Sequence, residues 1–226
     1  AWKQALARTG DAQRPPVHLV VLENTHNRCG GAPLPLDYVR SVVDLAHAEG
    51  AWVHVDGAFG LWAAAVPELA AQVEGVERAD SWATDAHKWL NVPYDSGLAI
   101  VADPAPHRAA LSLKASYLQR GDDEERAGMD WVPESSRRAR VVPLYALIRA
   151  LGRDGIADLV RRSCALARRM AARLSGQPGV AILNEVVLNQ VLVQFSGATG
   201  ANSDDTTRGV IERVQQLSRA ASSRAA

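Results

Sequence analysis

The chain has 226 residues, of which 47% are hydrophobic, so it can bury a core and has the composition of a globular protein. Its 25 basic and 25 acidic side chains balance, which excludes the broad charged surface expected of proteins that bind nucleic acid or anionic membranes. No apolar run reaches the roughly 20 residues that span a bilayer, and the first residues lack the pattern of a secretory leader. The two cysteines, Cys29 and Cys164, provide no disulfide framework, so we expect a cytoplasmic protein.

Short apolar runs alternate with helical patterns through the first half of the chain. Four of these runs are typical of strands, at residues 17–22, 52–55, 81–84 and 97–101. The first two are almost continuously apolar, as expected of strands buried on both faces. Between the strands, 36–46 repeats apolar residues at helical spacing, and 63–79 indicates a broken helix. This order predicts an α/β fold with a mainly parallel sheet and functional loops at the carboxyl ends of the strands.

The second half of the chain follows a different pattern. The charged stretch Gln119–Arg126 is typical of a mobile loop. After it the sequence predicts helices at 144–151 and 156–174, strands at 180–183 and 191–195, and a helix at 206–217. We therefore expect a larger α/β domain over 1–126 and a smaller, incomplete α+β domain over 127–226. Because Ala1–Ala7 already have the pattern of a helix interior, we also expect the chain to be a fragment.

A lysine follows the third predicted strand in the segment Asp80-Ser81-Trp82-Ala83-Thr84-Asp85-Ala86-His87-Lys88-Trp89. The ordinary interpretation is an exposed lysine at the end of a strand. A lysine amine that is partly removed from water is also the group that bonds to the aldehyde of pyridoxal phosphate (PLP) in enzymes that use this cofactor. The sequence therefore makes Lys88 a candidate for the residue that holds PLP.

An aspartate ends the second predicted strand in the segment His54-Val55-Asp56-Gly57-Ala58-Phe59-Gly60. In PLP enzymes a carboxylate pairs with the protonated pyridine nitrogen and keeps the ring able to accept electrons. Asp56 is the candidate for this role, and the small residues Gly57 and Ala58 would let the flat ring lie against the backbone. The simpler interpretation of the small residues is a tight turn after the strand.

Together these two segments resemble the group II PLP-dependent amino-acid decarboxylases, whose patterns read His-Val-Asp-Ala-Ala and, later, Asp-Ser-…-His-Lys-Trp. Gly57 stands where that pattern has its first alanine. The likeness continues through Leu90–Gly97 and Ser135–Arg140 and covers roughly residues 50–211. The resemblance implies the PLP-dependent transferase fold of aspartate-aminotransferase type (fold type I), with 1–126 as the carboxyl-terminal half of the large cofactor domain. It also implies a homodimer with its active sites at the interface.

The same resemblance implies roles for further residues. His87 would contact the cofactor phosphate or orient the neighbouring lysine, and Tyr117 is similar in placement to the loop tyrosine that returns a proton to the substrate carbon. Asp85 stands where the family often has an asparagine that contacts the phosphate, and a carboxylate is unfavourable in that role. The adjacent Arg137 and Arg138 fit a substrate contact no better than a solvated or interface pair.

The first part of the chain carries a different resemblance. Leu22–Gly31 and Leu34–Tyr38 look more like the threonine aldolases, which are PLP enzymes of the same fold type. In this segment Thr25 is a candidate for contact with the phenolic oxygen or the ring of the cofactor. The aldolase pattern His-Leu-Asp-Gly-Ala-Arg continues with an arginine, whereas this chain has Phe59. The change of resemblance indicates a mosaic gene or a divergent branch.

The resemblance implies a PLP-dependent carboxy-lyase that releases carbon dioxide from an amino acid and forms an amine. Two alternatives stay open, a PLP-dependent aldolase that cleaves a β-hydroxy amino acid such as threonine and a catalytically inactive fragment. Aromatic amino acids, glutamate and aspartate all fit as substrates of a decarboxylase. No regular ligand spacing links the candidate metal ligands, so we expect no metal site; these are His26, Cys29, His54 and Asp56.

Overall fold

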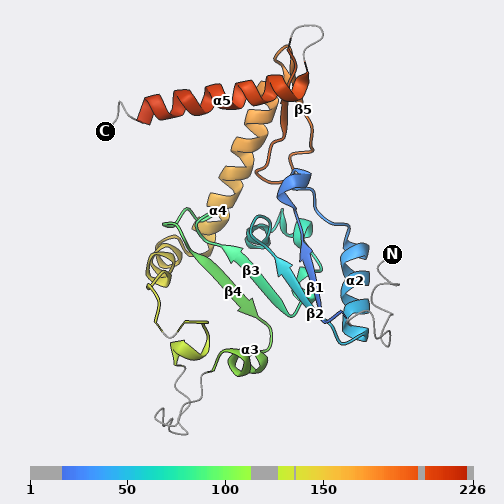
Figure 1. The fold of residues 1–226 in the computed structure, drawn as a ribbon, viewed down its shortest axis with the longest axis vertical. Coiled ribbons are helices and arrows are strands. Elements are labelled where there is room, and N and C mark those ends of the chain that lie inside the picture. Colours follow the sequence, from blue (N-terminus) through green and yellow to red (C-terminus); the bar gives the residue numbers. More distant parts are fainter. Residues whose placement is uncertain (1–16, 113–126, 135, 198–201, 223–226) are drawn as a thin grey trace. The chain divides into compact units, whose positions relative to one another are not determined.

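The computed structural model of the chain describes residues 17–112, 127–134, 136–197 and 202–222 (Figure 1). Three sequence predictions fall outside this part of the chain: the helix pattern at Ala1–Ala7, the loop at Gln119–Arg126 and the candidate proton donor Tyr117. Among the described helices, none is long and apolar enough to pass through a membrane.

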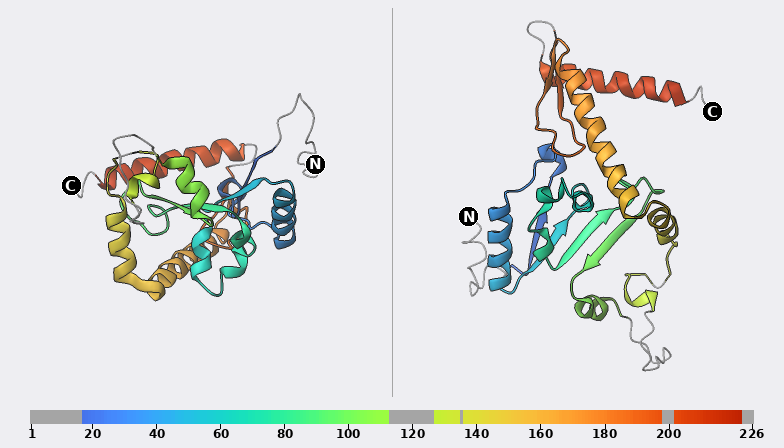
Figure 2. Two further views of the ribbon diagram at one scale, coloured as in Figure 1. Left: turned by 90° about the horizontal axis from the view of Figure 1, so that it is seen from below. Right: turned by 180° about the vertical axis from the view of Figure 1, so that it is seen from behind.

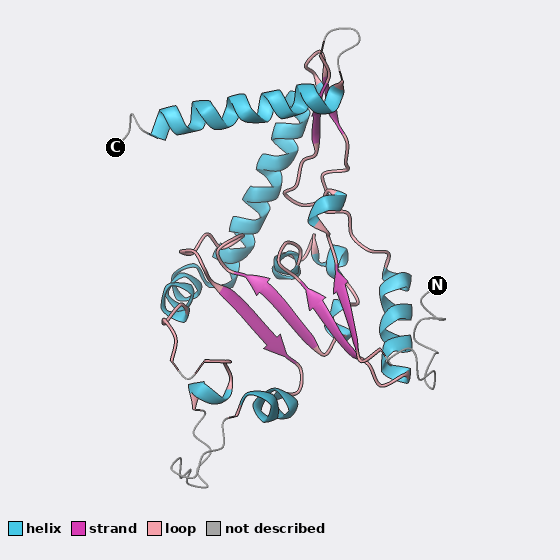
Figure 3. Cartoon of the chain, viewed as in Figure 1, coloured by secondary structure: helices cyan, strands magenta, loops and turns pink. Residues whose placement is uncertain are grey.

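A four-stranded sheet forms the centre of the first half of the chain. Its strands are β1 (Leu19–Glu23), β2 (Trp52–Asp56), β3 (Ser81–Asp85) and β4 (Gly97–Val101), in that order across the sheet. The first three are parallel, and β4 runs antiparallel to β3, as its reversed arrow in Figure 3 shows. No helix separates β3 from β4 along the chain, so this connection reverses direction instead of crossing over. The predicted α/β fold with a mainly parallel sheet is confirmed.

One face of this sheet carries the core. Helix α2 (Leu36–Ala48) lies beside β1 and β2 in both Figure 1 and Figure 2, and it buries Val43 completely. Alternate residues of β2, Val53 and Val55, are buried as well. Because successive side chains of a strand point to opposite faces, this alternation indicates burial on one side of the sheet.

The other face of β1 is not covered by any described segment. Leu19 and Val21 are 54% and 53% exposed, whereas Val20 and Leu22 between them are buried. The expectation that this strand is buried on both faces is therefore wrong for the described chain. A continuous apolar run predicts that both faces of a strand are buried, but it does not show which segment of the chain covers the second face.

The segment predicted as a broken helix forms three short 3-10 turns instead. They are η2 (Leu61–Ala65), η3 (Ala70–Val73) and η4 (Val76–Arg78). Pro67 has no amide hydrogen to continue a helix, and Gly75 adopts a left-handed conformation (φ 91°) before the last turn. Ala63, Val66 and Val73 are nevertheless buried, so the segment contributes to the core without forming an α-helix.

The remaining elements are η1 (Asn27–Cys29), α3 (Pro104–Leu111), η5 (Gly128–Asp130), α4 (Val141–Ser175), the antiparallel pair β5 (Val180–Ile182) and β6 (Val193–Phe195), and α5 (Ser203–Ser222). From α4 onward they follow the predicted order, whereas the sequence patterns did not predict η1, α3 or η5. Helix α4 joins the two predicted helices across Gly152, whose backbone is not helical (φ 62°, ψ −170°), so the predicted break is confirmed. Helix α5 begins at Ser203, ahead of the predicted Thr206, because the side chain of Asn202 accepts a hydrogen bond from the N–H of Asp204 and caps the helix.

The chain divides into two compact units. The first comprises the described residues up to Asn24 together with Leu34–Ala157, and the second comprises Thr25–Pro33 and the described residues from Asp158 onward. Within the second unit, the side chain of Asn184 donates a hydrogen bond to the carbonyl oxygen of Gly30 (2.7 Å). The predicted domains 1–126 and 127–226 stay a prediction, because a division into compact units does not test domain boundaries.

Candidate active site

Lys88 lies in the turn that follows β3. The turn folds back on the end of the strand, since the N–H of Lys88 donates to the carbonyl oxygen of Asp85 (3.4 Å). The side-chain nitrogen Nζ of Lys88 lies 2.7 Å from Oδ2 of Asp85, and it stands 4.5 Å from the centroid of the Phe59 ring. The Lys88 side chain is 34% exposed and that of Asp85 is 29% exposed. The lysine is therefore neither freely solvated nor removed from water.

Asp56 is the last residue of β2 and is half-buried. Its Oδ1 accepts a hydrogen bond from the N–H of the half-buried Ala58 (3.0 Å), and its Oδ2 has no polar partner among the described residues. Two hydrogen bonds fix the turn after β2 to β3. The N–H of Gly57 donates to the carbonyl oxygen of Ala83 (2.8 Å), and the hydroxyl of Thr84 donates to the carbonyl oxygen of Gly57 (3.1 Å). One carboxylate oxygen thus orders the turn, and the other is available to a ligand.

The structure brings the segments that contain Asp56 and Lys88 together. β2 and β3 are neighbouring parallel strands, and Asp56 pairs in register with Ala83. Phe59, three residues after the end of β2, supplies the ring that lies under the Lys88 amine. The two candidate residues therefore occupy the carboxyl edge of the sheet, as the sequence predicts.

Gly57 occupies a place where packing leaves no room for a side chain. A Cβ atom there would lie 2.6 Å from Cβ of Leu61 and 3.0 Å from the carbonyl oxygen of Ala83. Protein atoms thus fill this space, which favours a tight turn over a surface for the cofactor ring. Because neither atom belongs to the end of a flexible side chain, we expect Gly57→Ala to lower the free energy of unfolding by about 1–3 kcal/mol.

Chemical denaturation of the purified variant measures this effect. Gly128→Ala is the matched control in the same compact unit, because no atom lies within 4 Å of a Cβ built at Gly128. Equal and small effects of the two substitutions would contradict the packing account of Gly57.

His87 precedes the lysine, and its ring is held in place. Its Nδ1 lies 3.0 Å from both the backbone nitrogen and the carbonyl oxygen of Ser96, so this nitrogen is engaged in either tautomer. The ring centroid of Tyr94 lies 4.1 Å from that of His87, with the two planes at 47°. Because Ser96 is buried at the entry to β4, the imidazole has a fixed orientation and Nε2 is the nitrogen left for a ligand.

Thr25 belongs to the second compact unit and is fully buried. Its φ of 60° lies in the left-handed region, where a β-branched residue is a conformational outlier. Such outliers cluster at functional sites, which keeps Thr25 a candidate for contact with a cofactor. Asp56 and Lys88 belong to the first unit, so the structure does not test whether Thr25 lies in the same site as these two residues.

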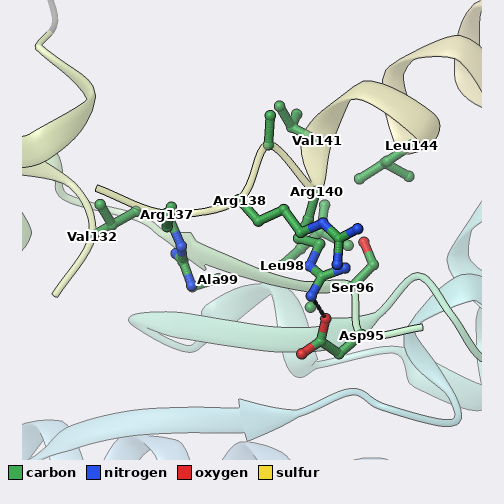
Figure 4. A pocket seen from close by; sticks show the side chains of 12 residues that line it. Asp95, Ser96, Leu98, Ala99, Val132, Arg137, Arg138, Arg140, Val141 and Leu144 are labelled. Carbon is green, nitrogen blue, oxygen red and sulfur yellow. Dashed lines mark ion pairs between the residues drawn. The ribbon is translucent and has the colours of Figure 1, made fainter. Parts of the chain in front are cut away.

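A separate pocket of about 400 Å³ lies between the start of β4 and the segment that leads into α4 (Figure 4). Three arginines line it, and two of them are paired: Arg140 Nη2 lies 2.5 Å from Asp95 Oδ1, and Arg137 Nε lies 3.4 Å from Glu134 Oε2. Figure 4 shows the side chain of Arg140 directed toward that of Asp95. Arg137 and Arg138 are both exposed, which agrees with their interpretation as a solvated pair, and no catalytic role is assigned to them.

The segments that contain Asp56 and Lys88 match a known protein family. The model of the pyridoxal-dependent decarboxylase conserved domain matches residues 33–196, well over half of the chain. The match includes Asp56, His87 and Lys88. The chain belongs to the pyridoxal-dependent decarboxylase family. The family predicted from the two sequence motifs is therefore confirmed, and with it the PLP-dependent fold of type I.

Individual relatives show how much of a decarboxylase this chain represents. Tryptophan decarboxylase TDC1 of Camptotheca acuminata is 28% identical over 174 residues, which cover 76% of this chain and 35% of the relative. The aromatic-L-amino-acid decarboxylase of Rattus norvegicus is 27% identical over 205 residues, or 89% of this chain and 42% of the relative. The crystal structure of Oryza sativa TDC with PLP and tryptamine matches with a TM-score of 0.80 at 25% identity, over 95% of this chain and 45% of that one. The chain thus spans less than half the length of each of these proteins.

The cofactor of the decarboxylase family fits the residues at this sheet edge. Lys88 offers a primary amine, the group that bonds to an aldehyde, and Asp56 offers a carboxylate oxygen without a partner in the described chain. Asp85 is a poor neighbour for a phosphate, because both groups are anions. Among the described residues, no group of three or more His, Cys, Asp or Glu side chains is placed to hold a metal ion.

The sequence prediction missed both contacts of the Lys88 side chain. The family motif compares Asp85 with an asparagine that contacts a phosphate, and the aldolase pattern compares Phe59 with an arginine, so neither comparison points to a contact with the lysine. The spacing of Asp85 and Lys88 was the available signal for the ion pair, since both lie in one short turn. The contact with Phe59 had no such signal, because it depends on the path of the chain after β2.

Proposed function

We propose that this chain supplies the PLP-binding lysine of an enzyme that decarboxylates an L-amino acid, with carbon dioxide and an amine as products. The observation that carries the proposal is the placement of Asp56 and Lys88 at neighbouring strand ends, in a member of the pyridoxal-dependent decarboxylase family. PLP supplies the electron-accepting ring that this chemistry requires. The residues of the chain hold that ring and tune its charge.

Each candidate residue has a distinct task in this proposal. Lys88 binds the cofactor through its amine, and the Oδ2 atom of Asp56 pairs with the protonated ring nitrogen. Nε2 of His87 contacts the cofactor or steadies the lysine, since Nδ1 of the same ring is already engaged. Thr25 is the candidate for a contact from the second unit. Tyr117, which lies outside the described residues, is the proposed donor of the proton that replaces the carboxylate.

An aromatic L-amino acid is the substrate class that the comparisons support best. The relatives named above are a tryptophan decarboxylase and an aromatic-L-amino-acid decarboxylase, and the rice structure contains tryptamine. The proposed active form is a homodimer, as the family resemblance implies, and its proposed location is the cytoplasm, which the two unpaired cysteines favour. Light scattering of the purified protein measures the mass of this assembly.

A product assay tests the proposed reaction. The purified protein is mixed with PLP and, separately, with tryptophan, tyrosine, glutamate, aspartate and threonine, and carbon dioxide, amines and aldehydes are measured. We expect carbon dioxide and the matching amine from an aromatic amino acid, and no product from a Lys88→Ala control. Glycine and acetaldehyde from threonine would favour an aldolase instead. PLP binding without any product would support the inactive alternative.

A further inference from the structure

We infer that Asp85 is a positioning residue that holds the Lys88 amine as an ammonium ion and thereby limits its reaction with electrophiles. This inference rests on the proposed role of Lys88 and deepens it. It concerns the resting state of the chain, in which the lysine has to be released before it can bond to an aldehyde.

Two contacts of Lys88 favour the charged amine. The distance of 2.7 Å from Nζ to Asp85 Oδ2 is that of a charge-assisted hydrogen bond. The Phe59 ring, 4.5 Å from Nζ, adds the attraction of an aromatic face for a cation. A neutral amine would lose much of both interactions. Because only about a third of either charged side chain is exposed, water screens the pair less than it screens a pair on an open surface.

The position of the carboxylate is set by the backbone. Asp85 ends β3 and pairs across the sheet with Gly97 of β4. A Cβ atom at Gly97 would lie 3.6 Å from Asp85 Oδ1, so the carboxylate lies over a residue without a side chain. Lys88 is fixed by its own backbone hydrogen bond to Asp85. The strand and the turn thus hold the two partners in place.

Other ionisable groups near this sheet edge are engaged elsewhere or form no pair with Lys88. His87 is bound to Ser96 and packs against Tyr94, and Asp95 pairs with Arg140. Asp56, at the end of β2, accepts a hydrogen bond from its own turn. Within the described part of the chain, Asp85 is the carboxylate within ion-pair distance of the Lys88 amine. The experiment that tests the inference therefore removes the charge of the Asp85 carboxylate.

Removal of this charge has a predictable chemical consequence. An ammonium ion has no free electron pair, so it must give up a proton before the nitrogen attacks a carbonyl carbon. Asp85→Asn keeps the size of the side chain and removes the charge that stabilises the proton. We expect Lys88 to react about two- to fivefold faster near neutral pH, the range that corresponds to the loss of a partly exposed ion pair.

Trace acetylation of the full chain without PLP measures this reactivity. In the reaction the amine loses its proton to the buffer, a nitrogen–carbon bond forms with acetic anhydride, and acetate leaves. The chain has three lysines, Lys3, Lys88 and Lys114, so the other two serve as internal references in the mass spectrum. Labelling of Lys88 relative to Lys3 and Lys114 is compared between the wild type and Asp85→Asn, and only the labelling of Lys88 is expected to rise.

Control variants separate charge from structure. Asp85→Glu keeps the carboxylate and should label nearly as the wild type does. Asp95→Asn removes a carboxylate that pairs with Arg140, and it should leave Lys88 unchanged. Circular dichroism checks the fold, and Asp85→Ser replaces the asparagine variant if that one is unfolded. Unchanged or slower labelling of Lys88 in a folded variant without the Asp85 carboxylate would overturn the inference.

A failure of this inference can be distinguished from a failure of the proposed function. If PLP binds wild-type protein through Lys88 but Asp85→Asn leaves the labelling unchanged, the inference fails and the function stands. If the variant labels faster but PLP does not bond to Lys88, the ion pair is real and the cofactor role fails.

Discussion

Lys88→Ala is expected to abolish the visible absorbance band that forms when the protein is mixed with PLP. Lys88 is the only lysine in the described part of the chain, and no other described side chain offers a primary amine. Without it, any PLP that binds is held by noncovalent contacts alone and keeps the spectrum of the free aldehyde. Absorbance spectroscopy in the near-ultraviolet and visible range measures the difference directly.

Lys114→Ala is the matched control for this result. It removes the same side chain from a lysine that the family motif does not contain, so the band should remain. If the band persisted in Lys88→Ala and disappeared in Lys114→Ala, the assignment of the cofactor lysine would be wrong.

Asp56→Asn is expected to separate cofactor chemistry from cofactor attachment. The amide keeps the shape of the side chain and its acceptor for the N–H of Ala58, but it cannot pair as an anion with a protonated ring nitrogen. We expect the affinity for PLP to fall about tenfold or more, as when a hydrogen bond to a charged group is lost. Amine formation should fall further, by about 10²- to 10³-fold, because the charge acts mainly on the transition state.

Titration with PLP and an assay of amine release give the two values for Asp56→Asn. Asp95→Asn is the control, since it removes an exposed carboxylate that pairs with Arg140 outside the candidate site. Wild-type activity in the Asp56 variant would exclude this carboxylate as the partner of the ring nitrogen.

The strands of the sheet were predictable because short apolar runs in the local sequence indicate where each strand lies. The runs at 52–55 and 81–84 lie within β2 and β3, and each strand ends at an aspartate. Parallel pairing follows from the segments that connect the strands, so the meeting of the Asp56 and Lys88 segments could be inferred before any coordinates were known. The helix pattern between Pro35 and Gly50 likewise matched α2.

Features that depend on contacts distant in sequence were not predictable. The exposed face of β1 is an example, because an apolar run at Leu19–Leu22 says nothing about which segment covers it. The 3-10 turns near Pro67 and Gly75 are a different case, because these two residues are a local signal against a helix that the apolar spacing of the segment outweighed in the prediction. At the site itself, the Phe59 contact with Lys88 required the path of the turn after β2.

Borohydride reduction of the protein mixed with PLP, followed by mass spectrometry of its peptides, tests most directly the claim that Lys88 holds the cofactor. Reduction makes the bond between the cofactor and its lysine permanent, so the modified residue can be read from the peptide masses. We predict that the phosphopyridoxyl group is found on the peptide that contains Lys88 and not on those that contain Lys3 or Lys114. A group found on Lys3 or Lys114, or on no lysine, would contradict the account.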